Sequence, residues 1–264
     1  MSTEGPPTDR WLELVARREH AVALAGLAGI VALAWIHLVR LSREMADMAE
    51  MGMAPTATWT LTDAALAASM WAVMMVGMML PSAAPMILMF VTVNRKRRGE
   101  GGMPVASTGL FTLGYLLAWV GFSLLAAAAQ WGLQAAAVMN PEAMTVTPFI
   151  GAAVLIAAGI YQLTPLKYAC LARCRSPLGF LLTSWRDGRG GAIVMGLHHG
   201  LYCLGCCWLL MALLFVGGVM NLVWVAAVAV FVLAEKVLPT GRLLSWIAGA
   251  ALIVWGLAML GRAL

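Results

Sequence analysis

The chain contains 264 residues, of which 62% are hydrophobic and 11% are charged, and its formal net charge is +5. Its mean hydropathy is +0.88. A soluble domain of this length needs more charged surface, so the composition excludes an ordinary soluble protein. The positive charge does not indicate nucleic-acid binding, because the basic residues lie in short segments between apolar runs, where membrane proteins carry them.

Long continuous apolar runs predict helices that cross a membrane. Backbone polar groups inside a bilayer must be satisfied within the protein, and strands of a membrane barrel would alternate apolar and polar residues, which these runs do not. We therefore expect an all-α, polytopic transmembrane helical bundle of about seven spans, at about 20 residues per crossing. The predicted spans are residues 21–41, 64–93, 107–133, 148–169, 192–216, 219–238 and 243–261.

The flanking charges predict the orientation of the bundle. Residues 1–20 are expected to form a polar N-terminal tail and residues 21–264 the transmembrane domain, since the first apolar run is too long for a cleavable signal peptide. The positive-inside rule then predicts a cytoplasmic N-terminus. The basic residues behind this prediction are Arg17, Arg18, the run 95–98, Lys167, Arg173, Arg175, Arg186, Arg189, Lys236 and Arg242.

Methionines are concentrated on one side of the predicted span 64–93. Thioether sulfur is a soft, neutral ligand that suits Cu(I), and neutrality favours a cation site inside a membrane. The alternative is that these flexible side chains only fill gaps between helices. Pro81 and Pro85 predict a kink or a break in the same span. The candidate metal ligands here are Met74, Met75, Met78 and Met79.

The predicted span 192–216 carries histidines and cysteines at helical spacing. Positions 199, 203, 206 and 207 fall on one stripe of a helix, whereas position 198 points about 100° away. Imidazole and thiolate together suit copper, zinc or iron. The alternative is that the cysteines pack as small apolar residues and the histidines hydrogen-bond between helices. The candidate ligands are His198, His199, Cys203, Cys206 and Cys207.

An acidic residue and two further cysteines have several possible roles, between which the sequence pattern does not decide. Glu235 is a candidate metal ligand, a proton acceptor for a histidine, or an ion-pair partner of Lys236 or a loop arginine. Cys170 and Cys174 lie one helical turn apart. Three interpretations stay open for them: metal ligands, thiols that exchange with a cytosolic thiol, or reduced cysteines with a structural role. Gly196, Gly200 and Gly205 indicate a close contact between helices.

A methionine-rich segment follows the first predicted span. The segment 43–53 places its methionines at MxxM and MxM spacings beside two acidic residues. One interpretation is a mobile segment that captures copper ions outside the membrane. The other is an interfacial helix whose methionines face lipid.

Three segments resemble a known bacterial family. MWAVMMVGMMLPSAAPM, LTPLKYACLARCRSP and HHGLYCLGCCWLLMALLFVGGVMN followed by EK occur in order within about residues 60–240. They are similar to a domain-of-unknown-function family described as predicted metal-binding integral membrane proteins, some members of which carry a copper-chaperone label. The resemblance implies candidate functional positions at Met74, Met75, Met78, Met79, His198, His199, Cys203, Cys206, Cys207 and Glu235.

These observations favour a membrane protein that binds a soft metal and acts in copper capture, transfer or delivery. The abundance of methionine favours copper, as Cu(I), over zinc or iron. Its expected partners are the lipid bilayer and a periplasmic or membrane copper-handling protein, with no nucleic acid. Two other interpretations stay open: a membrane metalloenzyme such as a copper- or iron-dependent oxidase, and a metal-free structural or assembly subunit.

Overall fold

The computed structural model describes residues 7–51, 59–98, 104–140 and 144–263, and the all-α prediction is confirmed. The first half contains α1 (Pro7–Glu50), α2 (Leu61–Arg98), α3 (Pro104–Ala135) and a short antiparallel hairpin of β1 (Met139–Asn140) and β2 (Thr145–Val146). The second half contains α4 (Pro148–Gln162), α5 (Pro165–Arg175), α6 (Pro177–Ser184), α7 (Gly188–Ala212), α8 (Leu214–Gly217), α9 (Leu222–Val237) and α10 (Gly241–Ala263).

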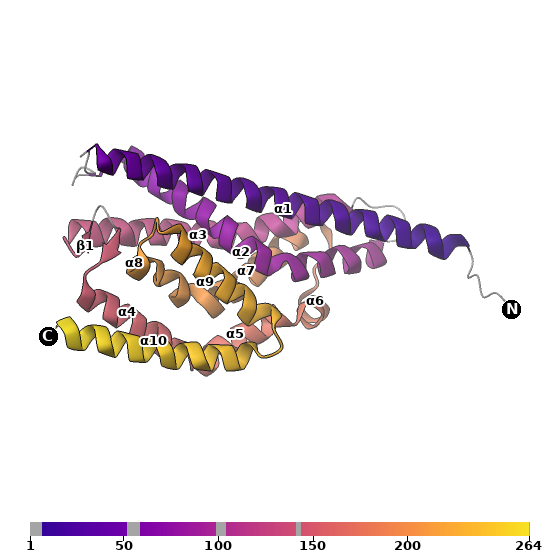
Figure 1. Ribbon diagram of the computed structural model, residues 1–264. Coiled ribbons are helices and arrows are strands. Elements are labelled where there is room, and N and C mark those ends of the chain that lie inside the picture. Colours follow the sequence, from indigo (N-terminus) through magenta and orange to yellow (C-terminus); the bar gives the residue numbers. More distant parts are fainter. Residues whose placement is uncertain (1–6, 52–58, 99–103, 141–143, 264) are drawn as a thin grey trace.

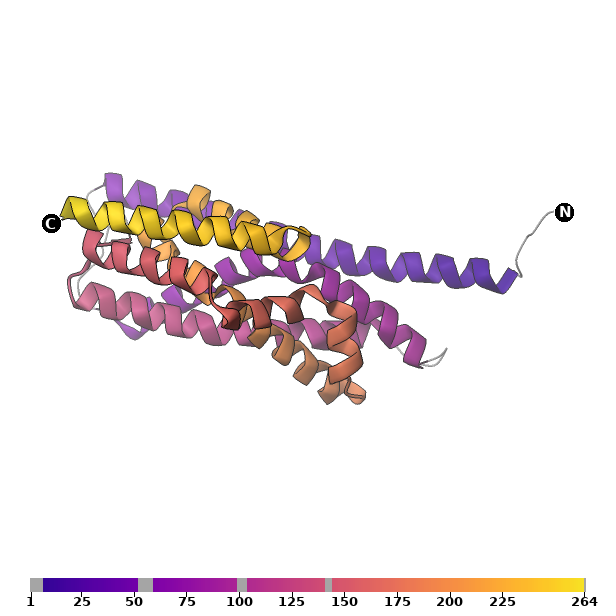
Figure 2. The ribbon, with the colours of Figure 1, turned by 90° about the horizontal axis from the view of Figure 1, so that it is seen from below.

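The long helices run roughly along one axis of an elongated bundle (Figure 1). Helix α1 lies along one side of the molecule and packs on α2, whereas α4 and α10 lie side by side on the other. Between them, α3 packs against both α2 and α7, and α9 contacts α2. Figure 2 shows that α1 begins at the end of the molecule opposite to the one where α10 ends.

Five helices in the described part of the chain are long and apolar enough to cross a membrane. They cover Arg18–Met48, Leu61–Arg97, Ser107–Ala135, Gly188–Gly217 and Gly241–Arg262. This is compatible with a multi-pass membrane protein. The predicted span 148–169 is not one helix, because α4 and α5 meet at an angle of 65°. The predicted number of about seven spans is therefore not confirmed.

The bend between α4 and α5 has a local cause. Pro165 occupies the first turn of α5, where its missing N–H costs nothing, and the residue before a proline avoids the helical conformation. Thr164 is accordingly extended, with φ −78° and ψ 148°, and its side chain accepts a hydrogen bond from the backbone N–H of Lys167. A threonine cap and a proline thus end one helix and start the next.

Helix α1 is longer than the first apolar run. It begins at Pro7, so the predicted polar tail of residues 1–20 is helical from that residue onward. At its other end the helix includes Met45 and Met48 and stops at Glu50. Of the methionine-rich segment, Met53 lies outside the described residues.

Of the kink or break predicted at Pro81 and Pro85, the break is wrong, because α2 is one helix with both prolines inside it. Pro81 has no N–H for the carbonyl of Gly77, four residues earlier. The indole of Trp35 on α1 donates a hydrogen bond to that carbonyl over 3.3 Å. Side chains of neighbouring helices commonly satisfy backbone groups freed by proline in membrane helices, so α2 continues through the prolines.

Glycines bring α3 and α7 into close contact, as the sequence predicted. A Cβ atom at Gly196 would collide with the carbonyl oxygen of Phe111, and one at Gly114 would collide with that of Ile193. Small residues at such positions let two backbones approach closely in a membrane. This contact fixes how α7 is rotated against α3. The rotation in turn fixes the direction in which the α7 cysteines point.

Candidate metal centre

The sulfur of Cys203 on α7 lies at a meeting point of four helices. The ammonium group of Lys236, on α9, lies 2.8 Å from this sulfur and donates a second hydrogen bond over 2.9 Å to the hydroxyl of Ser82, on α2. The hydroxyl of Tyr115, on α3, lies 3.1 Å from the same sulfur. Cys203 is 1% exposed, so this polar cluster lies in the interior of the bundle.

Three further thiols gather at Cys203. The side chains of Cys174, Cys206 and Cys207 all lie near enough to the Cys203 thiol to influence its ionisation. Cys206 and Cys207 come from the same helix, and their thiols donate to the backbone carbonyl of Cys203 over 3.0 and 2.9 Å. Cys174 comes from α5, which packs on α7. The bend between α4 and α5 thus places a cysteine from a separate helix beside the α7 stripe.

The methionines of α2 face the interior. All four candidate ligands, Met74, Met75, Met78 and Met79, are at most 1% exposed. Tyr115 connects this face to the cysteines, because its hydroxyl donates to the backbone carbonyl of Met79 over 3.1 Å and also contacts Cys203. Helix α3 packs against both α2 and α7, and the Tyr115 hydroxyl bridges the backbone of α2 and the sulfur of Cys203.

The two adjacent histidines of α7 have different surroundings. His198 is exposed, as its predicted rotation away from the cysteine stripe requires. His199 is 3% exposed and lies among the rings of Phe111, Tyr115 and Phe180. Its Nδ1 atom is buried without a hydrogen-bond partner among the described residues.

Glu235 belongs to a separate buried network. Its carboxylate forms an ion pair with Lys167, with Nζ–O distances of 2.6 and 2.9 Å. Ser245 donates to one carboxylate oxygen over 2.6 Å, and Gln162 donates to it over 3.2 Å. Of the roles considered for Glu235, the ion pair is the one present here, although its partner is Lys167 and not Lys236 or an arginine.

Two lysines that we had counted as loop charges are interior residues. Lys167 is 0% and Lys236 9% exposed, so neither contributes to the charged surface used to predict the orientation. Their buried ammonium groups are stabilised by specific acceptors, as membrane-embedded charges generally are. The orientation prediction therefore depends on the remaining basic residues.

The three thiols of α7 all make polar contacts within the protein. Among the residues that the structure describes, no group of three or more His, Cys, Asp or Glu side chains is arranged to hold a metal ion. The Cys206 and Cys207 thiols point to a backbone carbonyl, and the Cys203 sulfur faces an ammonium group. Metal capture at this cluster thus requires side-chain rotations that turn the sulfurs toward a common point.

All residues of this cluster lie within the part of the sequence that matches a known protein family. The PpoB2 family, which is described as Copper chaperone, matches residues 68–259. The chain belongs to this copper chaperone family. No curated protein and no solved structure matches it. The copper chaperone match includes α2, α3, α5, α7 and α9, the helices that contribute the thiols, the thioethers, Tyr115 and Lys236.

Two residues at the centre of this cluster were not predicted from the sequence. Lys236 was assigned to a loop, yet Val228, Val232 and Lys236 follow one another at intervals of four residues, which places the lysine on the buried face of α9. Tyr115 was not singled out at all. It follows Gly114, the glycine of α3 that packs against α7. A tyrosine next to a glycine at a close helix contact could have been predicted to face the interior.

Proposed function

We propose that this copper chaperone family member binds Cu(I) as its cargo within the membrane, at the thiols around Cys203, and passes it on. The observation that carries the proposal is the gathering of Cys174, Cys206 and Cys207 at the sulfur of Cys203. Soft thiolate and thioether ligands select Cu(I), which accepts low coordination numbers, so a pair of these sulfurs is enough to hold it.

The buried methionines supply a route to the thiols. Met70, Met74 and Met78 follow one another along α2 toward Ser82, a distance of about 18 Å at 1.5 Å per residue. Neutral thioethers let a monovalent cation move through the bundle without adding buried negative charge. Met48 and Met51, at the end of α1, are 42% and 65% exposed and serve as capture ligands at the surface.

The proposal includes a membrane arrangement. The chain crosses a bacterial inner membrane with its N-terminus in the cytoplasm, and the bent pair α4–α5 and the 16-residue α9 complete about seven crossings with the five long helices. The basic residues Arg95, Lys96 and Arg97 then lie on the cytoplasmic side, as the positive-inside rule requires. Copper enters from the methionine-bearing end of α1 and leaves to a periplasmic or membrane partner.

An anaerobic copper titration tests the site. The purified protein in lipid nanodiscs is titrated with Cu(I) against a colorimetric chelator, as wild type and as the variants Cys203→Ser and Cys207→Ser. Each variant is expected to weaken Cu(I) binding by at least about tenfold, because a soft ligand is replaced by a hard one. Cys170→Ser is the matched control, since the Cys170 sulfur lies against Gly205. Unchanged affinity in the Cys203 and Cys207 variants would disprove the site.

A second comparison tests the methionine route. Met74→Leu and Met78→Leu each remove a thioether of the route while preserving buried volume. We expect the Cu(I) affinity at equilibrium to change little and the rate of loading from the outside to fall. Met259→Leu is the control, because Met259 packs on Gly151 of α4, away from α2. Equal loading rates in all three variants would exclude the route.

A further inference from the structure

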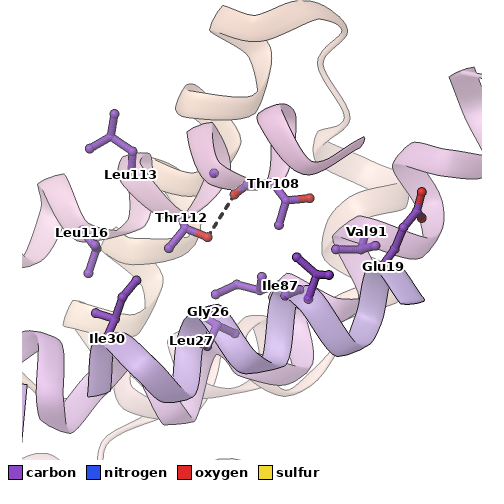
Figure 3. A pocket seen from close by; sticks show the side chains of 13 residues that line it. Glu19, Gly26, Leu27, Ile30, Ile87, Val91, Thr108, Thr112, Leu113 and Leu116 are labelled. Carbon is purple, nitrogen blue, oxygen red and sulfur yellow. Dashed lines mark hydrogen bonds between the residues drawn. The ribbon is translucent and has the colours of Figure 1, made fainter. Parts of the chain in front are cut away.

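A groove of about 400 Å³ lies between α1 and α3, with α2 at its base (Figure 3). Leu27 and Ile30 of α1, Ile87 and Val91 of α2, and Leu113 and Leu116 of α3 form most of its apolar wall. Helices α1, α2 and α3 are all long and apolar enough to cross a membrane. In a bilayer the groove is therefore surrounded by lipid.

One end of the groove is polar. Glu19 lines it there, and its Oε2 atom is buried without a hydrogen-bond partner among the described residues. Thr112 is also in the wall, but its hydroxyl donates to the backbone carbonyl of Thr108 over 3.0 Å within α3. Glu19 is half-buried, and its Oε2 atom is a buried acceptor that lacks a donor, which is costly to leave unsatisfied.

The length of the groove corresponds to one leaflet of a bilayer. From Glu19 to Ile30, α1 rises by about 16 Å at 1.5 Å per residue, and half of a hydrocarbon core is about 15 Å. Glu19 lies at the start of the apolar part of α1, where lipid headgroups begin. At this level His20 on α1 is hydrogen-bonded to Thr92 on α2 over 2.9 Å, which holds the two helices together.

We propose that this groove is a specific binding site for one phospholipid with a primary ammonium headgroup, of the phosphatidylethanolamine class. One acyl chain lies along the apolar wall, and the ammonium group donates to the Glu19 carboxylate. Charge complementarity selects this headgroup, since a charge-assisted hydrogen bond satisfies the buried oxygen.

The headgroup is tested by lipid competition. The protein is reconstituted in nanodiscs that contain equal amounts of phosphatidylethanolamine and phosphatidylglycerol, and the lipid that remains bound is identified by native mass spectrometry after detergent release. One bound phosphatidylethanolamine per protein is expected, and Glu19→Gln should reduce its preference over phosphatidylglycerol by about tenfold. Bound lipid at the bulk ratio in the wild type would overturn the proposal.

The position is tested by a pair of glycines on α1. Neither Gly26 nor Gly29 has any atom within 4 Å of a Cβ position, but only Gly26 lines the groove. Gly26→Phe is expected to fill the groove and abolish lipid retention, whereas Gly29→Phe should retain the lipid. Equal retention in the two variants would place the lipid elsewhere and refute the site. Both variants have the same cost in helix propensity, so a general loss of folding would affect them alike.

Discussion

The ammonium group of Lys236 lies 2.8 Å from the sulfur of Cys203, inside a bundle of apolar helices. The two residues come from α9 and α7, and both are at least nine-tenths buried. A Cu(I) ion held by two thiolates forms a complex with a net negative charge. Lys236 therefore supplies the opposite charge at the place where such a complex would form, and in a medium of low dielectric constant this attraction is strong.

Replacement of Lys236 by leucine, which adds no sulfur ligand, should weaken Cu(I) binding by at least about tenfold, because the copper–thiolate complex loses its countercharge. Lys236→Arg should retain most of the affinity, since it keeps the positive charge. The measurement is a competitive Cu(I) titration in nanodiscs, with the thermal midpoint of the copper-free protein recorded for each variant. Tighter binding by Lys236→Leu would show that the ammonium group opposes the metal.

Removal of the charge from Glu235 should destabilise the protein without affecting copper directly. Glu235→Gln leaves the ammonium group of Lys167 buried without its carboxylate, and breaking a buried ion pair costs about 3–5 kcal/mol. The free energy of unfolding in detergent and SDS mixtures measures this loss. The double variant Lys167→Met with Glu235→Leu should recover part of it. If folded Glu235→Gln protein fails to bind Cu(I), Glu235 has a role in the metal site as well.

A methyl group at Gly196 should push α3 and α7 apart. Gly196→Ala places a Cβ atom against the carbonyl oxygen of Phe111, and overpacking of this kind costs about 1–3 kcal/mol. Gly121→Ala on α3 is the matched control, because a Cβ atom there meets nothing within 4 Å. The control should be neutral or slightly more stable, since alanine favours a helix. Equal stability of the two variants would contradict the close contact.

The hydrogen bond from Trp35 to Gly77 predicts a coupling with Pro81. Trp35→Phe alone leaves the Gly77 carbonyl without a donor and should cost about 1 kcal/mol. In the presence of Pro81→Ala, the new backbone N–H can bond to this carbonyl, and the cost of Trp35→Phe should fall. A double-mutant cycle on the free energy of unfolding measures the coupling. Additive effects would mean that the indole does not replace the missing bond.

The predictions made from sequence differ in outcome because they depend on different kinds of information. The contact of Gly196 and Gly200 with another helix was predicted correctly, since small residues in an apolar helix indicate a close neighbour. The break at Pro81 was not, because the donor that repairs it, Trp35, lies 42 residues away in the chain. The partner of Glu235 was missed for a similar reason, because Lys167 reaches it only through the bend after Gln162.

Composition and the helical period are local properties, so the apolar helices and the residues that share a face of each helix could be predicted from the sequence. The methionines of α2 and the cysteines of α7 were found in the same way. Which faces meet depends on the packing of the helices: Lys236 and Tyr115 join Cys203, Cys174 approaches the same thiol from α5, and Glu235 pairs with Lys167. A helical period fixes the direction of a side chain relative to its own axis, whereas the neighbour in that direction depends on how the helices pack.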